Sequence, residues 1–183
     1  MNQETTIVFV TYNSTHLVND FLSSLGDYPV IVVDNASKDD TCEHIQNQFP
    51  SVKLYRNAVN IGYGRAANQA FKQVTTKYAL LVNPDTSFTA SAVNALESKI
   101  SYFSQENWLF AAPNTKENAD RDSDTSQQAP SEPQETTFAG GAAMLFNMDA
   151  FRAIGGFDEN IFLYFEETDL CTRAAQKQYK MYY

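Results

Sequence analysis

Short apolar runs recur along the chain, and polar residues follow each of them. The clearest run is Tyr78–Val82, which leads directly into Asn83, Pro84 and Asp85. An uninterrupted apolar run bounded by a turn predicts a strand that is buried on both faces, as in sheets covered by helices. Because proline cannot donate to a sheet ladder, we expect pairing to stop near Pro84. Asp85 then lies just past the carboxyl end of a central strand, where open α/β sheets bind ligands.

The rest of the pattern alternates between strands and helices. Further strands are predicted at Thr6–Val10, Pro29–Val33, Val52–Tyr55, Trp108–Pro113, Phe138–Phe146 and, just beginning, Tyr179–Tyr183. Helices are predicted from the N-cap Ser14 to Leu25, over Asp39–Phe49, after the glycines at 62 and 64, over Ala90–Phe103 and Asn147–Ile154, and from the acids at 166–169. Strand, helix, strand is a βαβ unit, so the pattern predicts an α/β fold.

The segment Asn114–Thr137 differs in kind, because it is rich in Asp, Glu, Ser, Gln and Pro and has almost no apolar residues. It cannot bury enough surface to order itself, so we expect a flexible loop. A lid that orders over a ligand is the alternative.

Composition narrows the classes of function. The 183 residues are enough for one domain with its own core. A formal net charge of −9 argues against a general nucleic-acid binder, which needs clustered Lys and Arg. Cys42 and Cys171 suggest no disulfide framework, and no apolar stretch fits a signal peptide or a membrane span. We therefore expect a reduced, cytoplasmic setting.

Two stretches suit an anionic ligand and a metal. The Asp85 carboxylate is a natural ligand for Mg²⁺ or Mn²⁺, although Asn83–Asp85 can also be a plain turn. Glycines that open a helix place free N–H groups and a positive dipole end near any phosphate, and Arg65 adds a cation. The spacing Gly62-x-Gly64-x-x-Ala67 also matches the dinucleotide fingerprint, although residues 56–61 separate it from the preceding strand.

Two later stretches also allow two interpretations. Gly140 and Gly141 enter an apolar strand, which permits close approach of a ligand or tight strand packing. The acids at 166–169 open a helix, where they suit its dipole and where Asp169 can pair with Arg173. The aromatic residues just before them would instead raise carboxylate pKa values, as a general base requires.

Taken together, these stretches resemble the family 2 glycosyltransferases of the GT-A fold, especially the bacterial rhamnosyltransferase-like branch. The matching stretches, in family order, are Val10–Asn13, Val33–Ser37, Asn60–Asn68, Asn83–Asp85, Gly140–Gly141 and Gly155–Leu170. The resemblance implies a GT-A-type, Rossmann-like sheet that is mixed but mostly parallel and is flanked by helices. Residues 1–183 would then form a single catalytic domain, truncated where family members usually continue past Tyr183.

The resemblance also implies roles for individual residues. Glu167 stands at the position of the catalytic base, which would deprotonate an acceptor hydroxyl. Asp85 would bind the divalent cation, Mg²⁺ or Mn²⁺, that bridges the donor diphosphate. The implied nucleotide contacts are Thr11, Tyr12, Asn13, Asp34, Asn35, Gly62, Arg65, Asn68 and Asn83. The implied sugar or acceptor contacts are Gly140, Gly141 and Glu166. Two residues depart from the family pattern, because Asn83 replaces the first acid of the metal motif and Glu167 replaces an aspartate.

The expected activity is inverting, metal-dependent transfer of a sugar from a UDP- or dTDP-sugar, such as dTDP-rhamnose, to a hydroxyl of a cell-surface glycan or lipid-linked glycan. Such an enzyme would work in the cytoplasm or at the inner face of the membrane, as a peripheral protein. Two alternatives stay open. One is an NAD-linked oxidoreductase built on the Gly62–Ala67 fingerprint, and the other is an inactive nucleotide-sugar-binding or interaction module.

Overall fold

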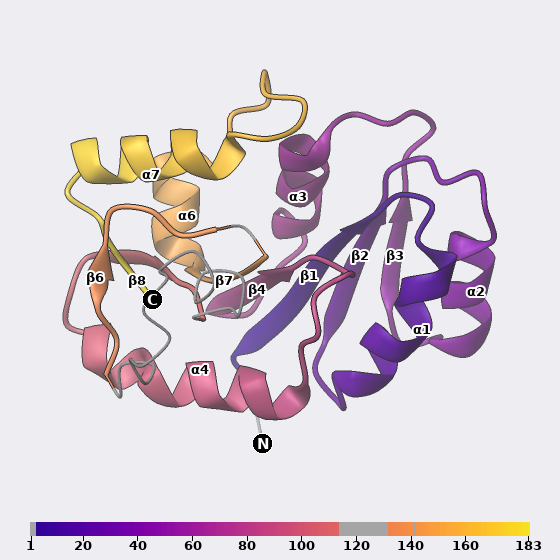
Figure 1. The fold of residues 1–183 in the computed structure, drawn as a ribbon, viewed down its shortest axis with the longest axis horizontal. Helices are drawn as coiled ribbons and strands as arrows, with labels where there is room; N and C mark the ends of the chain where they lie inside the picture. The colour runs from indigo at the N-terminus through magenta and orange to yellow at the C-terminus, as the bar shows by residue number, and fades with distance from the viewer. Residues whose placement is uncertain (1–2, 114–131, 141) are drawn as a thin grey trace, which may run out of the picture.

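A single eight-stranded sheet organises the residues that the computed structural model describes, which are 3–113, 132–140 and 142–183. Its strands are β1 (Thr5–Thr11), β2 (Val30–Asp34), β3 (Lys53–Arg56), β4 (Tyr78–Val82), β5 (Trp108–Ala111), β6 (Glu135–Thr136), β7 (Ala143–Asn147) and β8 (Lys180–Tyr182). Their order in the sheet is β3-β2-β1-β4-β7-β5-β8-β6 (Figure 1). The β1 strand pairs in parallel with β2 and β4, whereas β7 runs antiparallel between β4 and β5. The predicted mixed, mostly parallel sheet is therefore confirmed.

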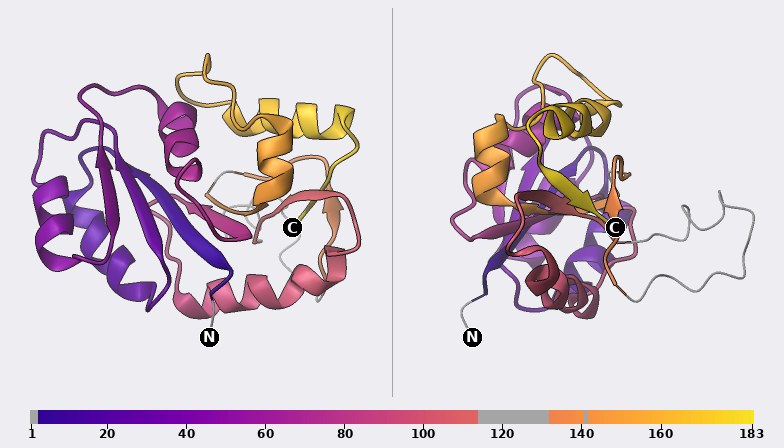
Figure 2. Two further views of the ribbon diagram at one scale, coloured as in Figure 1. Left: turned by 180° about the vertical axis from the view of Figure 1, so that it is seen from behind. Right: turned by 90° about the vertical axis from the view of Figure 1, so that its left-hand side faces the viewer.

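Helices cover both faces of this sheet. They are α1 (Thr15–Ser24), α2 (Thr41–Gln48), α3 (Tyr63–Phe71), α4 (Ala90–Phe103), α6 (Met148–Ile154) and α7 (Glu166–Gln176). One core cluster joins the sheet to α3, α6 and α7, and a second joins the other face to α1, α2 and α4. Figure 2 shows α6 and α4 on opposite sides of the sheet. Because both faces are covered, β4 is buried along its whole length, as its unbroken apolar pattern predicts.

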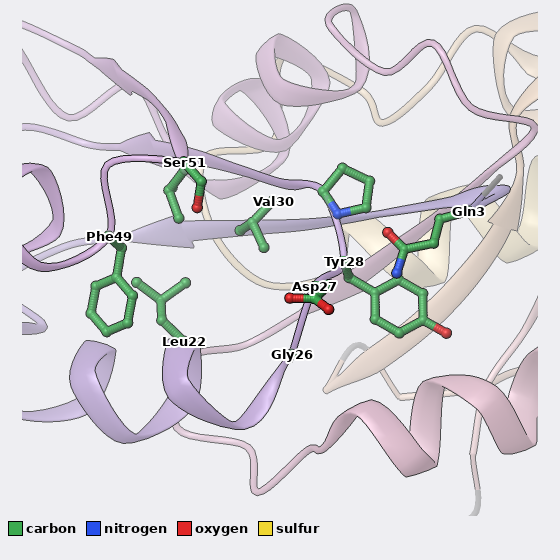
Figure 3. A pocket seen from close by; sticks show the side chains of 10 residues that line it. Gln3, Leu22, Gly26, Asp27, Tyr28, Val30, Phe49 and Ser51 are labelled. Atoms are coloured by element: carbon green, nitrogen blue, oxygen red, sulfur yellow. The ribbon is translucent and has the colours of Figure 1, made fainter. Parts of the chain in front are cut away.

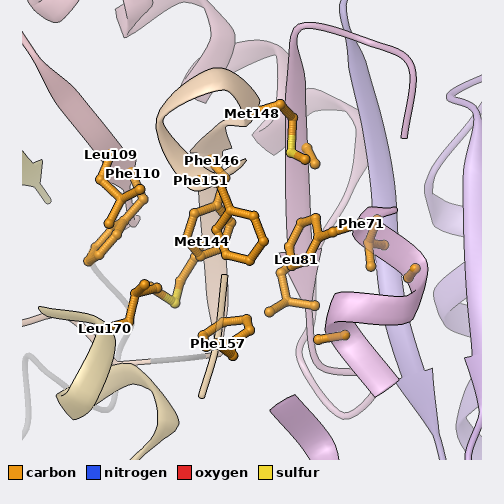
Figure 4. Close-up of a cluster of buried hydrophobic side chains, with 14 of the residues drawn as sticks. Phe71, Leu81, Leu109, Phe110, Met144, Phe146, Met148, Phe151, Phe157 and Leu170 are labelled. Carbon is orange, nitrogen blue, oxygen red and sulfur yellow. The ribbon is translucent and has the colours of Figure 1, made fainter. Parts of the chain in front are cut away.

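Aromatic packing fixes α3 and the segment after α6 against the sheet (Figure 4). The ring of Phe71 on α3 lies 4.3 Å from that of Phe151 on α6 and 5.4 Å from that of Phe146 on β7, between ring centroids. Phe157, just after α6, lies 5.5 Å from Phe151. Such ring pairs stabilise the fold beyond the burial of the rings themselves. The backbone on either side of Phe157 is therefore held in place.

Most predicted elements are confirmed, and the differences have local causes. Ser14 precedes α1, but its hydroxyl bonds the Tyr12 backbone instead of capping the helix. Residues 114–131 of the predicted flexible loop lie outside the described residues. At the end of that segment, Glu135–Thr136 forms β6, which composition did not predict, because it pairs with β8 from far along the chain. None of the helices in the described ranges has the length and apolar composition that a membrane span requires.

Candidate active site

The predicted site residues gather at one edge of the sheet, where the parallel strands end. Thr11 ends β1, Asp34 ends β2, and Asn83 follows β4. Thr11 and Asp34 are also partners in the strand register. Figure 1 shows the arrowheads of β1 to β3, the N-terminal end of α3 and the gold loop before α7 along the upper side of the molecule. The fold therefore brings together segments that are separated by more than a hundred residues of sequence.

Asp34 is held by a dense set of hydrogen bonds. Its side chain is 2% exposed, and Oδ1 accepts from Thr11 Oγ1 at 3.0 Å and from Ser37 Oγ. Its Oδ2 accepts from the Ser37 N–H at 2.9 Å. Burial, and then a hydrogen bond to Asp34, raises the pKa of the Cys42 thiol to about 11, so Cys42 stays neutral beside it. The position of this carboxylate is thus fixed before any ligand arrives.

The loop after β1 offers an accessible aromatic side chain. Asn13 has a left-handed backbone (φ 52°), its N–H donates to Ser37 Oγ at 2.8 Å, and its Oδ1 accepts from the Lys38 N–H at 2.8 Å. Tyr12, next to it, is 49% exposed. Asn13 is therefore occupied in joining two loops, whereas the Tyr12 ring is open to a ligand.

Asn35 is occupied by the loop between β3 and α3. Its Nδ2 donates to Asn60 Oδ1 at 2.8 Å and to the Gly62 carbonyl at 3.2 Å. Its Oδ1 accepts from the Ile61 N–H at 3.0 Å and from Asn57 Nδ2 at 3.3 Å. A primary amide has two N–H donors and two lone pairs, so these four bonds use all of its capacity. The structure gives Asn35 the role of holding this loop, and a direct nucleotide contact would have to displace one of these bonds.

The glycine motif of α3 docks against the loop that precedes α7. Gly62 has φ 91°, and a Cβ there would lie 2.5 Å from the carbonyl oxygen of Phe162. That same oxygen accepts the Tyr63 N–H at 2.9 Å. The first N–H of the helix, which sequence reasoning assigned to phosphate, therefore binds another segment of the chain.

Two other residues that were predicted to contact the nucleotide, Asn68 and Arg65, also hold the loop before α7. Asn68 is buried, and its amide both donates to the Phe157 carbonyl at 2.9 Å and accepts from the Phe157 N–H at 3.0 Å. Arg65 is exposed, and its Nε donates to the Glu159 carbonyl at 2.6 Å. Asn68 is placed to hold the chain at Phe157, whereas the terminal N–H groups of Arg65 make no hydrogen bond within the described residues and can bind an anion.

The acid pair opens α7 at the same edge. Phe165, at the N-cap position, is left-handed and gives no side-chain cap. Burial raises the pKa of both Glu166 and Glu167, although each carboxylate also accepts a hydrogen bond from its own N–H, which lowers the pKa. The predicted pair of Asp169 and Arg173 is present at 2.6 Å. The acids thus stabilise the helix end, and they also sit where a carboxylate holds its proton more tightly than in water.

The two acids differ in exposure. Glu166 is 3% exposed, and its Oε2 is enclosed with no hydrogen-bond partner in the described residues. Glu167 is half-buried. Of the two, Glu167 is the one that a ligand can approach.

Tyr63 is the residue that sequence reasoning missed. Its hydroxyl donates to Asn83 Oδ1 at 2.8 Å, which connects α3 to the turn after β4. Burial raises the pKa of Tyr63, and the negative charges of Glu167, Glu166 and Asp85 raise it further, so the phenol is neutral. The one available signal was a tyrosine between two glycines at the start of a helix.

The turn after β4 suits a metal that is shared with a diphosphate. Asp85 is exposed, and the described residues contain no group of three or more His, Cys, Asp and Glu side chains that could hold a metal by themselves. Mg²⁺ typically binds through one or two carboxylates together with substrate phosphates, so a single carboxylate fits this mode.

A Cβ on Gly140 would meet no atom within 4 Å, so packing does not explain that glycine; Gly141 lies outside the described residues.

A separate hollow lies at the opposite edge of the sheet (Figure 3). It has a volume of about 470 Å³, and Gln3, Leu22, Tyr28, Val30 and Phe49 are among its lining residues. Val30 begins β2, whereas Asp34 ends it. The hollow is therefore distinct from the edge that carries the predicted site.

The mixed, mostly parallel sheet with helices on both faces is the fold predicted above for the GT-A glycosyltransferases. The model of the family "Glycosyl transferase family 2" matches residues 6–155, and the chain belongs to this family. The dinucleotide alternative loses its basis, because the strand before Gly62 is β3, at the edge of the sheet, rather than a central strand.

Similar proteins agree with this assignment. The N-acetylglucosaminyl-diphospho-decaprenol L-rhamnosyltransferase of Mycobacterium tuberculosis is 25% identical over 213 residues, covering 91% of this chain and 69% of the relative. A mannosyltransferase from Pyrobaculum calidifontis, solved with GDP-Man and Mn²⁺, aligns with a TM-score of 0.75 and 19% identity over 97% of this chain. The S. aureus TarS structure with UDP aligns with a TM-score of 0.71 and 17% identity over 98%. The chain spans 53% and 57% of those two solved chains.

The close contact between Gly62 and Phe162 yields a first prediction. Gly62→Ala should lower the free energy of unfolding, because the new Cβ would meet a backbone carbonyl and the residue would keep a positive φ. Gly155→Ala is the matched control, because Gly155 has φ 94° with nothing within 4 Å of its Cβ position. Urea unfolding should show a loss larger by about 1–3 kcal/mol for Gly62→Ala. Equal losses would contradict a tight docking of the loop.

The buried acid yields a second prediction, on pH and stability. Since the pKa of Glu166 is raised in the folded state, its contribution to stability is complete below the ordinary value of 4.5 and is lost as the pH rises through the folded pKa. Glu166→Gln cannot ionise, so its Tm relative to wild type should rise between about pH 4 and about pH 8. Glu43→Gln, on the exposed surface of α2, should track wild type. A Glu166→Gln difference that stays constant with pH would show that Glu166 is not desolvated.

Proposed function

We propose that the chain is the donor-binding and catalytic domain of an inverting, metal-dependent glycosyltransferase. It moves a sugar from a UDP- or dTDP-sugar to a hydroxyl of a cell-surface glycan. The observation that carries this proposal is the position of Tyr63, which donates a hydrogen bond to Asn83 and lies within electrostatic reach of Asp85 and of the acid pair of α7. The L-rhamnosyltransferase relative favours dTDP-rhamnose as the donor.

The donor lies along the carboxyl edge of the sheet in this proposal. The exposed Tyr12 ring contacts the base and ribose, and Thr11, which is fully buried, acts through its hydrogen bond to Asp34. Asp34 accepts from the N3–H of the pyrimidine with the remaining lone pair of Oδ2. Arg65, whose terminal N–H groups remain available, faces the diphosphate. Asp85 would hold Mg²⁺ or Mn²⁺ together with the diphosphate, and a metal there would supply positive charge to offset that of the leaving group.

Glu167 acts as the general base on an acceptor hydroxyl. The acceptor oxygen forms a bond to the anomeric carbon as the bond from that carbon to the diphosphate oxygen breaks. The hydroxyl proton passes to the Glu167 carboxylate, and the nucleoside diphosphate leaves. A single displacement from the opposite face inverts the anomeric carbon. The pKa of Glu167, raised by burial, brings its basicity closer to that of a group working near neutral pH.

The acceptor side of the site is apolar. Phe162, Leu163, Tyr164 and Phe165 are each between 49% and 73% exposed, and Glu166 follows them directly. Large exposed apolar patches mark surfaces that bind other molecules. Together with the polyprenol-linked sugar in the relative's name, this supports a lipid-linked glycan acceptor and peripheral association with the membrane.

Donor binding can be tested by calorimetric titration with UDP and dTDP, each with and without Mn²⁺. Because Asp85 is a single carboxylate, we expect weak binding of Mn²⁺ alone and mutual strengthening of nucleotide and Mn²⁺. Asp85→Asn should remove most of the strengthening by Mn²⁺. Asp27→Asn, at the opposite edge, should not change it. Nucleotide binding that ignores both Mn²⁺ and Asp85→Asn would refute the proposed metal site.

The general base can be tested by transfer from dTDP-rhamnose to N-acetylglucosaminyl-diphospho-polyprenol. Glu167→Gln should keep nucleotide affinity and lower kcat by about 10²–10⁴-fold. Unchanged transfer in Glu167→Gln would reject Glu167 as the base. Donor binding by the wild type with neither transfer nor donor hydrolysis would favour the remaining alternative, a nucleotide-sugar-binding module.

A further inference from the structure

We propose that Tyr63 is a positioning residue that fixes the Asn83 amide, so that Asn83 presents an N–H donor, and not an oxygen, to the bound diphosphate. This inference rests on the proposed function, because the ligand is the nucleoside diphosphate of the donor. It concerns the position where the chain departs from its family, with an amide in place of a carboxylate.

In the structure Asn83 Oδ1 faces the Tyr63 hydroxyl, and because an amide oxygen can only accept, the phenol is the donor. It donates to Asn83 Oδ1 at 2.8 Å, which occupies a lone pair of the amide oxygen. Within the described residues Asn83 Nδ2 makes no hydrogen bond. It is also not enclosed, because the buried polar atoms without a partner do not include it. The amide nitrogen is therefore accessible while the oxygen is occupied.

The ring of Tyr63 cannot easily leave this position. Its own N–H binds the Phe162 carbonyl, and Gly62 before it packs directly against that carbonyl. The Asn83 backbone is fixed as well, because its N–H donates to the Ala142 carbonyl at 3.0 Å, next to β7. Both partners thus lie on rigid backbone, and the orientation of the amide is set before a ligand binds.

This orientation gives Asn83 and Asp85 different roles in binding the ligand. An N–H donor can bind a phosphate oxygen directly, whereas an amide oxygen would be repelled by it. Asp85 alone then supplies the anionic ligand for a metal. The turn therefore binds the diphosphate partly without the metal, which a pair of carboxylates would not allow.

The test is a double-mutant cycle on UDP and dTDP affinity. Tyr63→Phe keeps the ring and removes the hydroxyl, so we expect metal-free nucleotide affinity to fall roughly threefold to tenfold. In the Asn83→Ala background the same change should have no further effect, because no amide remains to be fixed. Tyr55→Phe is the matched control: its hydroxyl donates to Gln73 Oε1 at 3.2 Å on the surface, and its loss should leave affinity unchanged.

A third variant separates the two roles of the turn. Asn83→Asp keeps an oxygen for the phenol but replaces the N–H donor with an anion. We expect it to lose metal-free nucleotide binding and to bind Mn²⁺ more tightly. Equal losses from Tyr63→Phe in the wild-type and Asn83→Ala backgrounds, or no loss in either, would overturn the proposal.

The same double-mutant cycle, measured on the thermal stability of the unliganded protein, separates failure of this proposal from failure of the proposed function. Thermal unfolding should show coupling between Tyr63→Phe and Asn83→Ala whether or not a ligand binds, because the hydrogen bond is internal. If the wild type binds neither nucleotide, the proposed function fails and the ligand step of this proposal fails with it. If the wild type binds nucleotide and the two changes are additive in affinity, this proposal alone fails.

Discussion

The contact between the Phe162 carbonyl and the start of α3 is the constraint on which the site depends. One oxygen accepts the Tyr63 N–H and touches Gly62 so closely that no side chain fits there. The contact joins the first half of the sheet, which carries Thr11 and Asp34, to the loop that leads into α7. Asn68 on α3 repeats the connection at Phe157, and Asn35 fixes Gly62 to the end of β2. The site is thus formed by two halves of the chain that hydrogen bonds to backbone atoms hold in register.

Several features that destabilise the fold are concentrated at the start of α7. Tyr164 and Phe165 both have positive φ, which is unfavourable for residues with a Cβ. Glu166 buries a carboxyl oxygen with no partner in the described residues, and four large apolar side chains face solvent before it. Strained backbone and unsatisfied polar groups persist where the surrounding fold over-determines them, and such features cluster at functional sites. Their meeting at the start of α7 supports this region as the centre of the chemistry.

The sequence predicted the scaffold well because the scaffold is local. The unbroken apolar run of β4 and the helical spacing of α4 each carry their own pattern, and both elements form where the pattern predicts. Short β6 was missed because its partner β8 is supplied from far along the chain.

Side-chain roles within the site were harder to predict. Asn35 and Asn68 belong to motifs that resemble nucleotide-binding stretches, yet their amides bind backbone and side chains of this chain. Sequence position identifies such a residue as important without saying what it touches. Tyr63 was missed for the complementary reason, because its partners are about 20 and 100 residues away and only the fold brings them together.

The left-handed turn at Tyr164 and Phe165 also determines which acid of α7 faces inward. Each residue added to a helix turns it by about 100°, so the phase of α7 depends on the number of residues between the anchored Phe162 carbonyl and the first helical turn. Loss or gain of a single residue in this span would rotate Glu166 out of the core and bring a neighbour in. The length of this loop, more than its apolar composition, therefore sets which side chains of α7 are buried and which face solvent.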